Sequence, residues 1–191
     1  DLPTPACMRE RLRAVPEVIA YTPSGGTPEY IETLRLYYER IGVRLSAEQL
    51  MATTGGSEAV EFALFACAGE GDEVLLVEPF YTNYLAFATM AGVRLKAAPT
   101  SGEDGFHLPP RAVWEQHLGP RTKAIVLCNP NNPTGTVYTR DEITMVAELC
   151  RDHGLFLVLD EVYREFAYDG RKPFSGLMLP GFDEQIIVVD S

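Results

Sequence analysis

Five short apolar runs recur along this chain, and segments of helical period lie between them. The runs cover residues 73–77, 93–98, 124–128, 156–159 and 185–189. Strands that are apolar throughout, rather than at every second position, are typical of a parallel sheet that is buried on both faces. A parallel connection has to cross over the sheet, and a helix is the usual crossover. The sequence therefore predicts an α/β fold with three layers: a mostly parallel sheet with helices on both faces.

Two helices are predicted from signals at their ends. Residues 29–41 follow Pro28, whose fixed backbone angle suits a first helical turn. A second helix begins at the Thr-x-x-Glu capping box of Thr139 and Glu142 and ends at Gly154.

The length of the chain suits one domain or a large part of one. With 191 residues, of which 46% are hydrophobic, it can build a substantial core. Residues 1–27 are rich in proline and glycine, and we expect them to form an N-terminal arm or part of a small domain. Residues 28–191 are expected to form the first part of a larger domain.

The charge of the chain excludes several classes of function. Sixteen basic against 27 acidic residues give a formal net charge of -11, and no cluster of lysine or arginine interrupts this excess. Nucleic-acid binding needs such a cluster, so we expect no nucleic-acid partner. No apolar stretch reaches the roughly 20 residues of a membrane span, and the first residues lack the pattern of a secretory signal. We expect a soluble, cytoplasmic protein with no membrane partner.

Cysteine and histidine predict no metal site. The four cysteines are too irregularly spaced for a zinc site or a disulfide framework, and we expect them to be small buried hydrophobic residues: Cys7, Cys67, Cys128 and Cys150. The three histidines, His107, His117 and His153, also lack ligand spacing.

In an open α/β sheet, ligands bind beyond the carboxyl ends of the strands, so the residues there are candidates for a site. Residues 51–54, which we interpret as a strand, are followed by GGSEAVEFALFA. The glycines allow close approach of a ligand, and the free amides of Gly56, Ser57 and Glu58 at a helix start favour an anion such as phosphate. A Gly-Gly turn with Ser57 as an ordinary N-cap explains the same letters.

Aromatic and amide side chains follow two further strands. Tyr81, in PFYTNY, can present its face to a planar ligand or fold into the core. In NPNNPTG, Pro130 and Pro133 rigidify the turn, so an asparagine amide held there loses little entropy on binding. Asn131 and Asn132 can instead serve turn geometry alone.

Asp160, in DEVYREF, directly follows a buried strand. A carboxylate there carries a large desolvation cost unless it meets a cation or several donors. Tyr163 lies three residues later and points the same way if a helical turn begins here. Alternatively, Asp160 only caps that turn.

A phosphate cradle, a flat aromatic, an amide, a phenol and a carboxylate together suit a phosphorylated, planar, heteroaromatic ligand, and pyridoxal 5'-phosphate matches each of them. At these residues the sequence resembles the class I/II aminotransferases, the aspartate-aminotransferase-like members of the fold-type I pyridoxal-phosphate-dependent enzymes. The resemblance rests on YTPSGGTPE, TTGGSEA, EPFYTNY, NPNNPTG and DEVYREF, which occur in the family's order. It implies the large cofactor-binding domain of that fold, incomplete in this chain.

The resemblance also implies a role for each candidate residue. Ser57, with the amides of Gly56 and Glu58, would hold the phosphate of the cofactor. The cofactor ring would stack on Tyr81, and its phenolic oxygen would accept hydrogen bonds from Asn132 and Tyr163. The ring nitrogen would pair with Asp160, and Ser191 would complete the cofactor site. Tyr21 would reach the phosphate of a neighbouring subunit. A homodimer with shared active sites is therefore expected.

In the resembling family the lysine that forms the Schiff base lies three residues after a serine at a strand end. Here that serine is Ser191, so the lysine is expected just beyond it and the chain is expected to be a fragment without activity of its own. Lys96, Lys123 and Lys172 are in no matching context.

The function implied is an aminotransferase that moves an amino group between an L-amino acid and a 2-oxo acid, with aspartate and 2-oxoglutarate favoured. A pyridoxal-phosphate-dependent lyase or synthase would use the same residues. A third interpretation is a non-catalytic, cofactor-sensing domain of a transcription regulator, against which the acidic charge argues.

Overall fold

Five parallel strands form the centre of the computed structural model, which describes residues 2–171 and 174–191. In chain order they are β1 (Glu73–Glu78), β2 (Arg94–Pro99), β3 (Thr122–Cys128), β4 (Phe156–Asp160) and β5 (Ile186–Val189). Their order across the sheet within these described ranges is β2-β1-β3-β4-β5, and every neighbouring pair is parallel. The predicted parallel sheet is confirmed.

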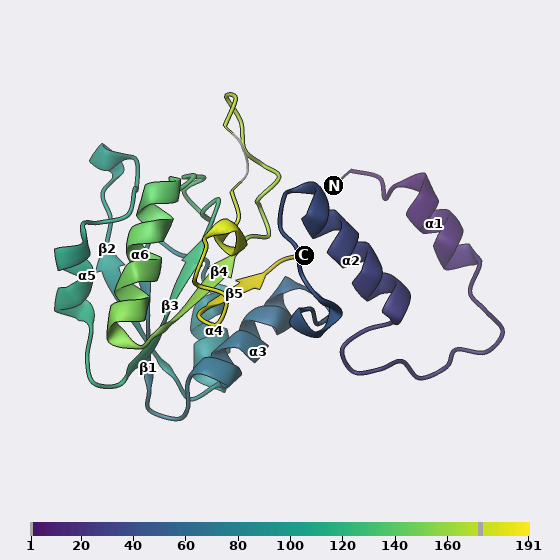
Figure 1. Ribbon diagram of the computed structural model, residues 1–191, viewed down its shortest axis with the longest axis horizontal. Coiled ribbons are helices and arrows are strands. Elements are labelled where there is room, and N and C mark those ends of the chain that lie inside the picture. Colours follow the sequence, from purple (N-terminus) through teal and green to yellow (C-terminus); the bar gives the residue numbers. More distant parts are fainter. Residues whose placement is uncertain (1, 172–173) are drawn as a thin grey trace.

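Alternate residues of each central strand enter one of two cores. Leu75 and Val77 pack on one face with α5 (Arg111–His117) and α6 (Arg140–His153). Val74 and Leu76 pack on the other face with α3 (Gly56–Cys67) and α4 (Asn83–Met90). Because both faces are covered, the strands read as apolar throughout. The three-layer arrangement visible in Figure 1 confirms the predicted architecture.

The predicted strand, helix, strand unit around α6 is confirmed at both ends. The hydroxyl of Thr139 accepts a bond from the Glu142 amide at 3.2 Å, and the Glu142 carboxylate accepts one from the Thr139 amide at 2.7 Å. The same carboxylate accepts a bond from the Leu108 amide at 2.7 Å, so it also ties the loop before α5 to α6. Gly154 ends the helix with a positive φ of 64°.

The N-terminal part contains two helices. The predicted helix is α2 (Pro28–Arg40), capped by the hydroxyl of Thr27. The other, α1 (Ala6–Arg13), was not predicted, has no buried residue and lies beyond α2, away from the sheet (Figure 1). Three short 3-10 helices complete the regular structure of the described residues: Ala47–Gln49, Gly102–Asp104 and Gly176–Met178. The division at residue 27 stays a prediction.

Two expectations from the sequence are wrong. Residues 51–54 form no strand in the described part of the chain. Their backbone bonds instead to a turn, with the Ala52 amide donating to the Gly25 carbonyl at 2.8 Å. Cys7 is exposed because α1 packs against no core, whereas Cys128 and Cys150 are buried as expected and Cys67 is half-buried.

Across the residues described, the helices are too short or too polar to cross a membrane.

The capping box at α6 yields a stability prediction. Thr139→Ala removes the side-chain acceptor for the Glu142 amide, so we expect the free energy of unfolding to fall by about 1 kcal/mol. Chemical denaturation measures this. Thr144→Ala is the matched control, because it makes the same change inside the helix, where alanine is favourable. An equal loss in both variants would contradict the capping role.

Candidate active site

The carboxyl ends of β1, β3, β4 and β5 and the start of α3 enclose one pocket of about 160 Å³. The site lies where the strand order reverses direction, between β1 and β3, which is the usual ligand position in open α/β sheets. Seven residues that were predicted from the sequence to form the site line this pocket: Gly56, Ser57, Tyr81, Asn132, Asp160, Tyr163 and Ser191. Segments far apart in the sequence are thus brought together as predicted.

One end of the pocket is the beginning of α3. The N-cap is Gly55, which has no side chain to cap the helix, so the alternative that Ser57 is an ordinary N-cap is wrong. The amides of Gly56, Ser57 and Glu58 have no acceptor among the described residues. Free amides at a helix start carry partial positive charge and favour an anion.

Glu58 contributes its amide but not its side chain to this end of the pocket. Its carboxylate accepts a hydrogen bond from the Thr54 amide at 2.6 Å, and Glu58 is not among the residues that line the cavity. The negative charge of Glu58 is therefore engaged by the backbone that precedes the helix.

Gly56 packs closely against the residues that follow β4 and β5. A Cβ at this position would lie 3.0 Å from Val162 Cγ2 and 3.3 Å from Ser191 Cβ. The absence of a side chain lets the helix start approach the ends of β4 and β5. The three segments consequently form one continuous wall of the pocket.

The three asparagines of NPNNPTG have different roles: two hold the loop in place, and one faces the pocket. Asn129 Oδ1 accepts a bond from the Tyr138 amide at 2.8 Å, and Asn131 Oδ1 accepts one from the Thr134 hydroxyl at 3.0 Å, so both hold the loop. The Asn132 side chain lines the pocket and has no hydrogen-bond partner within the described ranges. Turn geometry explains Asn131, and Asn132 is left as the amide available to a ligand.

Asp160 is a buried carboxylate, 7% exposed, at the end of β4. Oδ2 accepts a bond from the Tyr84 hydroxyl at 2.6 Å, and Oδ1 accepts one from the Val162 amide at 3.2 Å. Burial raises the pKa of Asp160, the two hydrogen bonds oppose that rise, and the nearby charge of Asp190 adds to it. The bond from Val162 shows that Asp160 does cap the following turn.

Neutral donors alone leave the Asp160 charge uncompensated. The nearest arginine in the sequence, Arg164, pairs with Glu161 and Asp190 instead. No ion pair involving Asp160 occurs in the described part of the molecule. A cationic ligand atom in the pocket would supply what this carboxylate lacks.

Two tyrosines that line the pocket, Tyr81 and Tyr163, differ in whether their hydroxyls have a hydrogen-bond partner. Tyr81 is half-buried; its hydroxyl accepts a bond from Asn83 Nδ2 at 2.7 Å, and its ring meets Tyr84 edge to face at 5.5 Å. Tyr163 follows in the turn after β4, and its hydroxyl has no partner among the residues described. The ring of Tyr81 is thus fixed by its neighbours, whereas the hydroxyl of Tyr163 is available to a ligand.

Three other residues considered from the sequence, Tyr21, Lys96 and Lys123, do not line this pocket. Tyr21 is fully exposed in the N-terminal segment and is not part of the pocket of its own chain. Lys96 pairs with Glu73 at 3.3 Å, Lys123 is exposed, and Lys172 lies outside the described residues. No group of three or more histidine, cysteine or acidic side chains in residues 2–171 and 174–191 can hold a metal ion.

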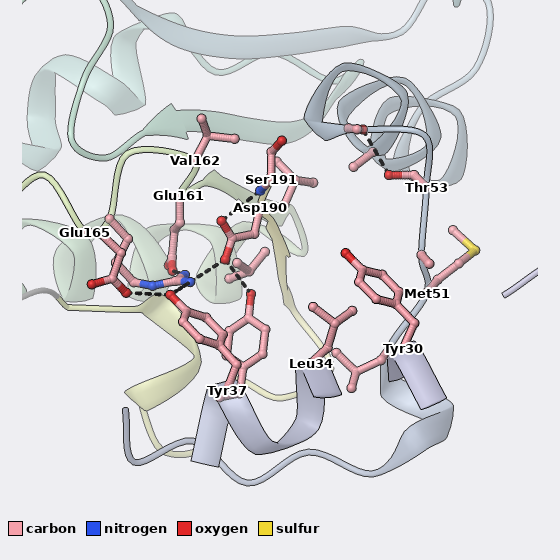
Figure 2. A pocket seen from close by; sticks show the side chains of 18 of the residues that line it. Tyr30, Leu34, Tyr37, Met51, Thr53, Glu161, Val162, Glu165, Asp190 and Ser191 are labelled. Atoms are coloured by element: carbon pink, nitrogen blue, oxygen red, sulfur yellow. Dashed lines mark hydrogen bonds and ion pairs between the residues drawn. The ribbon is translucent and has the colours of Figure 1, made fainter. Parts of the chain in front are cut away.

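A larger cavity of about 580 Å³ borders the same Ser191. In Figure 2, Leu34 and Tyr37 of α2 lie on one side of it, with Asp190 and Ser191 opposite. Three of its charges are paired with one another, because buried Arg164 bonds to Glu161 at 2.5 Å and also to Asp190. The Glu165 carboxylate accepts a bond from the Tyr37 hydroxyl at 2.5 Å. We interpret this network as the support of the strand ends rather than as the site.

Sequence reasoning missed Tyr84, Cys128 and Val162, which also line the smaller pocket. Tyr84 follows Tyr81 by three residues, the spacing of neighbours on a helix, and that was the available signal. The Arg164 network was missed because its partners come from distant segments.

A strand-end pocket with a helix-start anion site and a buried carboxylate is consistent with an enzyme that binds a phosphorylated cofactor. The model of the family "Aminotransferase class I and II" matches residues 3–191. The chain belongs to this family.

Individual relatives agree with this assignment. The chain is 36% identical to human kynurenine–oxoglutarate transaminase 1 over 183 residues, covering 90% of this chain and 43% of the relative. It is 34% identical to Thermus thermophilus aspartate/prephenate aminotransferase over 184 residues, covering 94% and 47%. The chain thus spans about half the length of the curated relatives it matches.

Solved structures show the same fold. A single mutant of Thermus thermophilus aspartate aminotransferase matches with a TM-score of 0.89 and 32% identity, over 100% of this chain and 50% of that one. The aromatic aminotransferase of Pyrococcus horikoshii matches with a TM-score of 0.90 and 28% identity, over 100% and 52%.

The buried charge of Asp160 leads to a prediction for the cofactor-free protein. Because its pKa is raised in the folded state, the protonated form stabilises the fold at low pH, and this stability is lost as the pH rises through that pKa. Asp160→Asn should therefore raise the free energy of unfolding at pH 7, by an amount that shrinks as the pH falls. Exposed Asp183→Asn is the matched control. A less stable Asp160→Asn variant at pH 7 would contradict the argument.

Proposed function

We propose that this chain is part of a pyridoxal-phosphate-dependent aminotransferase that moves an amino group between an L-amino acid and a 2-oxo acid. The observation that carries the proposal is the pairing, in one pocket, of free helix-start amides with a buried carboxylate that has no cation. A ligand with an anionic group at one end and a protonated ring nitrogen at the other satisfies both.

The residues present fit this cofactor. Ser57, with the amides of Gly56 and Glu58, would hold the phosphate, since these amides lie at the start of α3 and lack acceptors among the described residues. Tyr81 would contact the ring face. Asp160 would take the ring nitrogen.

The side chains without partners complete the fit. Asn132 and Tyr163 both line the pocket with donors that have no partner among the described residues, and they would bind the phenolic oxygen of the ring. Ser191 borders the start of α3 and would close the phosphate end. Each proposed contact uses a group that the protein itself leaves available.

When bound, the cofactor supplies an acceptor for the electron pair left as the substrate's Cα–H bond breaks. The task of Asp160 is to hold a proton at the ring nitrogen, because a carboxylate beside that atom favours its charged form. Donors at the phenolic oxygen, from Asn132 and Tyr163, hold the ring in register with the carboxylate. Buried apolar neighbours, including Phe87 and Val60, keep water from the pocket and strengthen these interactions.

The remaining proposals concern partners. We propose a homodimer with shared active sites, in which exposed Tyr21 reaches the partner's phosphate, since Tyr21 contacts no site in its own chain. The lysine of the reaction is proposed at the third position beyond Ser191. Relatives are named for kynurenine, aspartate and prephenate, and we propose aspartate with 2-oxoglutarate as the first pair to assay, in a cytoplasmic enzyme.

The phosphate site is tested by Ser57→Ala in the intact protein. Losing one hydrogen bond to a charged group should raise the dissociation constant of pyridoxal phosphate about tenfold. Turnover at saturating cofactor should change little, because the ring contacts remain. Equilibrium dialysis read by absorbance gives the constant, and Thr144→Ala on α6 serves as the control. Unchanged cofactor affinity would remove Ser57 from the site.

Asp160→Ala should show the opposite pattern. We expect kcat to fall by roughly 100-fold or more, because the charge that holds the ring proton is lost, while the phosphate contacts retain the cofactor. Amino-group transfer from aspartate to 2-oxoglutarate and cofactor content are measured on the same preparations. An intact protein that binds no pyridoxal phosphate, or a variant with undiminished turnover, would overturn the proposed function.

A further inference from the structure

Tyr84 occupies a position that the proposed chemistry does not by itself require. It lies in the first turn of α4, is 3% exposed and lines the pocket. Its hydroxyl donates to Asp160 Oδ2 at 2.6 Å, across 76 residues of sequence. A buried tyrosine hydroxyl needs a partner, and here that partner is the carboxylate at the centre of the site.

The two hydrogen bonds to Asp160 fix the orientation of its carboxylate. Tyr84 holds Oδ2, and the Val162 amide holds Oδ1 at 3.2 Å. A rotation about the Cβ–Cγ bond would break both. Because an ionised carboxylate accepts about four bonds, each oxygen keeps capacity for a further donor. The carboxylate is thus held in place without being saturated.

Tyr84 keeps its hydroxyl proton, and so stays a donor, above the pH at which an exposed tyrosine ionises, because its pKa is raised. Burial raises the pKa of its hydroxyl, and the adjacent Cys128 and Asp160 raise it further. The ring also meets Tyr81 edge to face, at 87° between planes. The same side chain therefore contacts both the carboxylate and the aromatic ring that borders the pocket.

We propose that Tyr84 is the positioning residue of this site, holding the Asp160 carboxylate and the Tyr81 ring in the mutual geometry that a planar cationic ligand needs. The role towards the cofactor rests on the proposed function. The role towards Asp160 does not, because the hydrogen bond belongs to the chain itself.

The test is Tyr84→Phe in the intact protein, first without cofactor. With ¹³C-labelled aspartate, the Asp160 resonance, assigned by its loss in Asp160→Asn, should titrate at higher pH in Tyr84→Phe, because a bond that favours the ionised form is gone. Tyr138→Phe is the matched control: Tyr138 is also 3% exposed, and its hydroxyl faces Asn131. It should leave the titration unchanged.

With pyridoxal phosphate bound, Tyr84→Phe should lower kcat about tenfold with little change in KM, the loss of roughly one charge-assisted hydrogen bond. The pH at which the absorbance of the bound cofactor changes should also move. In an Asp160→Asn background, Tyr84→Phe should add no further loss of kcat, since Tyr84 acts through Asp160.

Two results would overturn the inference: an Asp160 titration that is the same in Tyr84→Phe and the unaltered protein, or full additivity of the two substitutions. If Tyr84→Phe does not fold, the unaltered protein still tests the inference. Its Tyr84 ¹³Cζ resonance should shift at the pH at which Asp160 titrates, and a resonance that does not shift there would overturn the inference. A shifted titration in a protein that binds no cofactor would retain the positioning role and reject the proposed function.

Discussion

Parallel strand pairing is the constraint on which this molecule depends. Since every neighbouring pair of strands runs in the same direction, all carboxyl ends meet at one edge of the sheet. The middle of each central strand is filled with apolar side chains that enter two cores, and the polar side chains of the pocket lie at or beyond the carboxyl ends. The helix start at Gly56 closes this edge. A polar pocket is the direct result of the topology.

The sequence predicts the layers and most of the pocket because both depend on local patterns. Apolar runs mark the strands, and the residues that follow each run fall at the shared edge, where the structure has both Asp160 and Asn132. The prediction of a strand at residues 51–54 is wrong because a short segment before a Gly-Gly turn resembles a strand end until its hydrogen-bond partner, here the turn at Gly25, is known. Tyr84 was missed because its partner lies far away in sequence, and no local pattern contains that contact.

The site and the fold place opposite demands on Asp160. For the fold, a buried charge with neutral donors is unfavourable, and its pKa is raised accordingly. The same negative charge would attract a cationic ligand, because the ligand would compensate the charge of the Asp160 carboxylate. Tyr84 and Val162 limit the cost while leaving the attraction, which makes the carboxylate ionisable and oriented at once.

The close approach at Gly56 has a consequence for folding. Its neighbours there, Val162 and Ser191, belong to segments near the other end of the sequence, so the helix start reaches its final surroundings only after β4 and β5 have paired. Contacts of such long sequence separation form slowly and late. The end of the pocket at the start of α3 is thus a product of the completed sheet, and its wall is incomplete in a nascent chain that has not yet added β5.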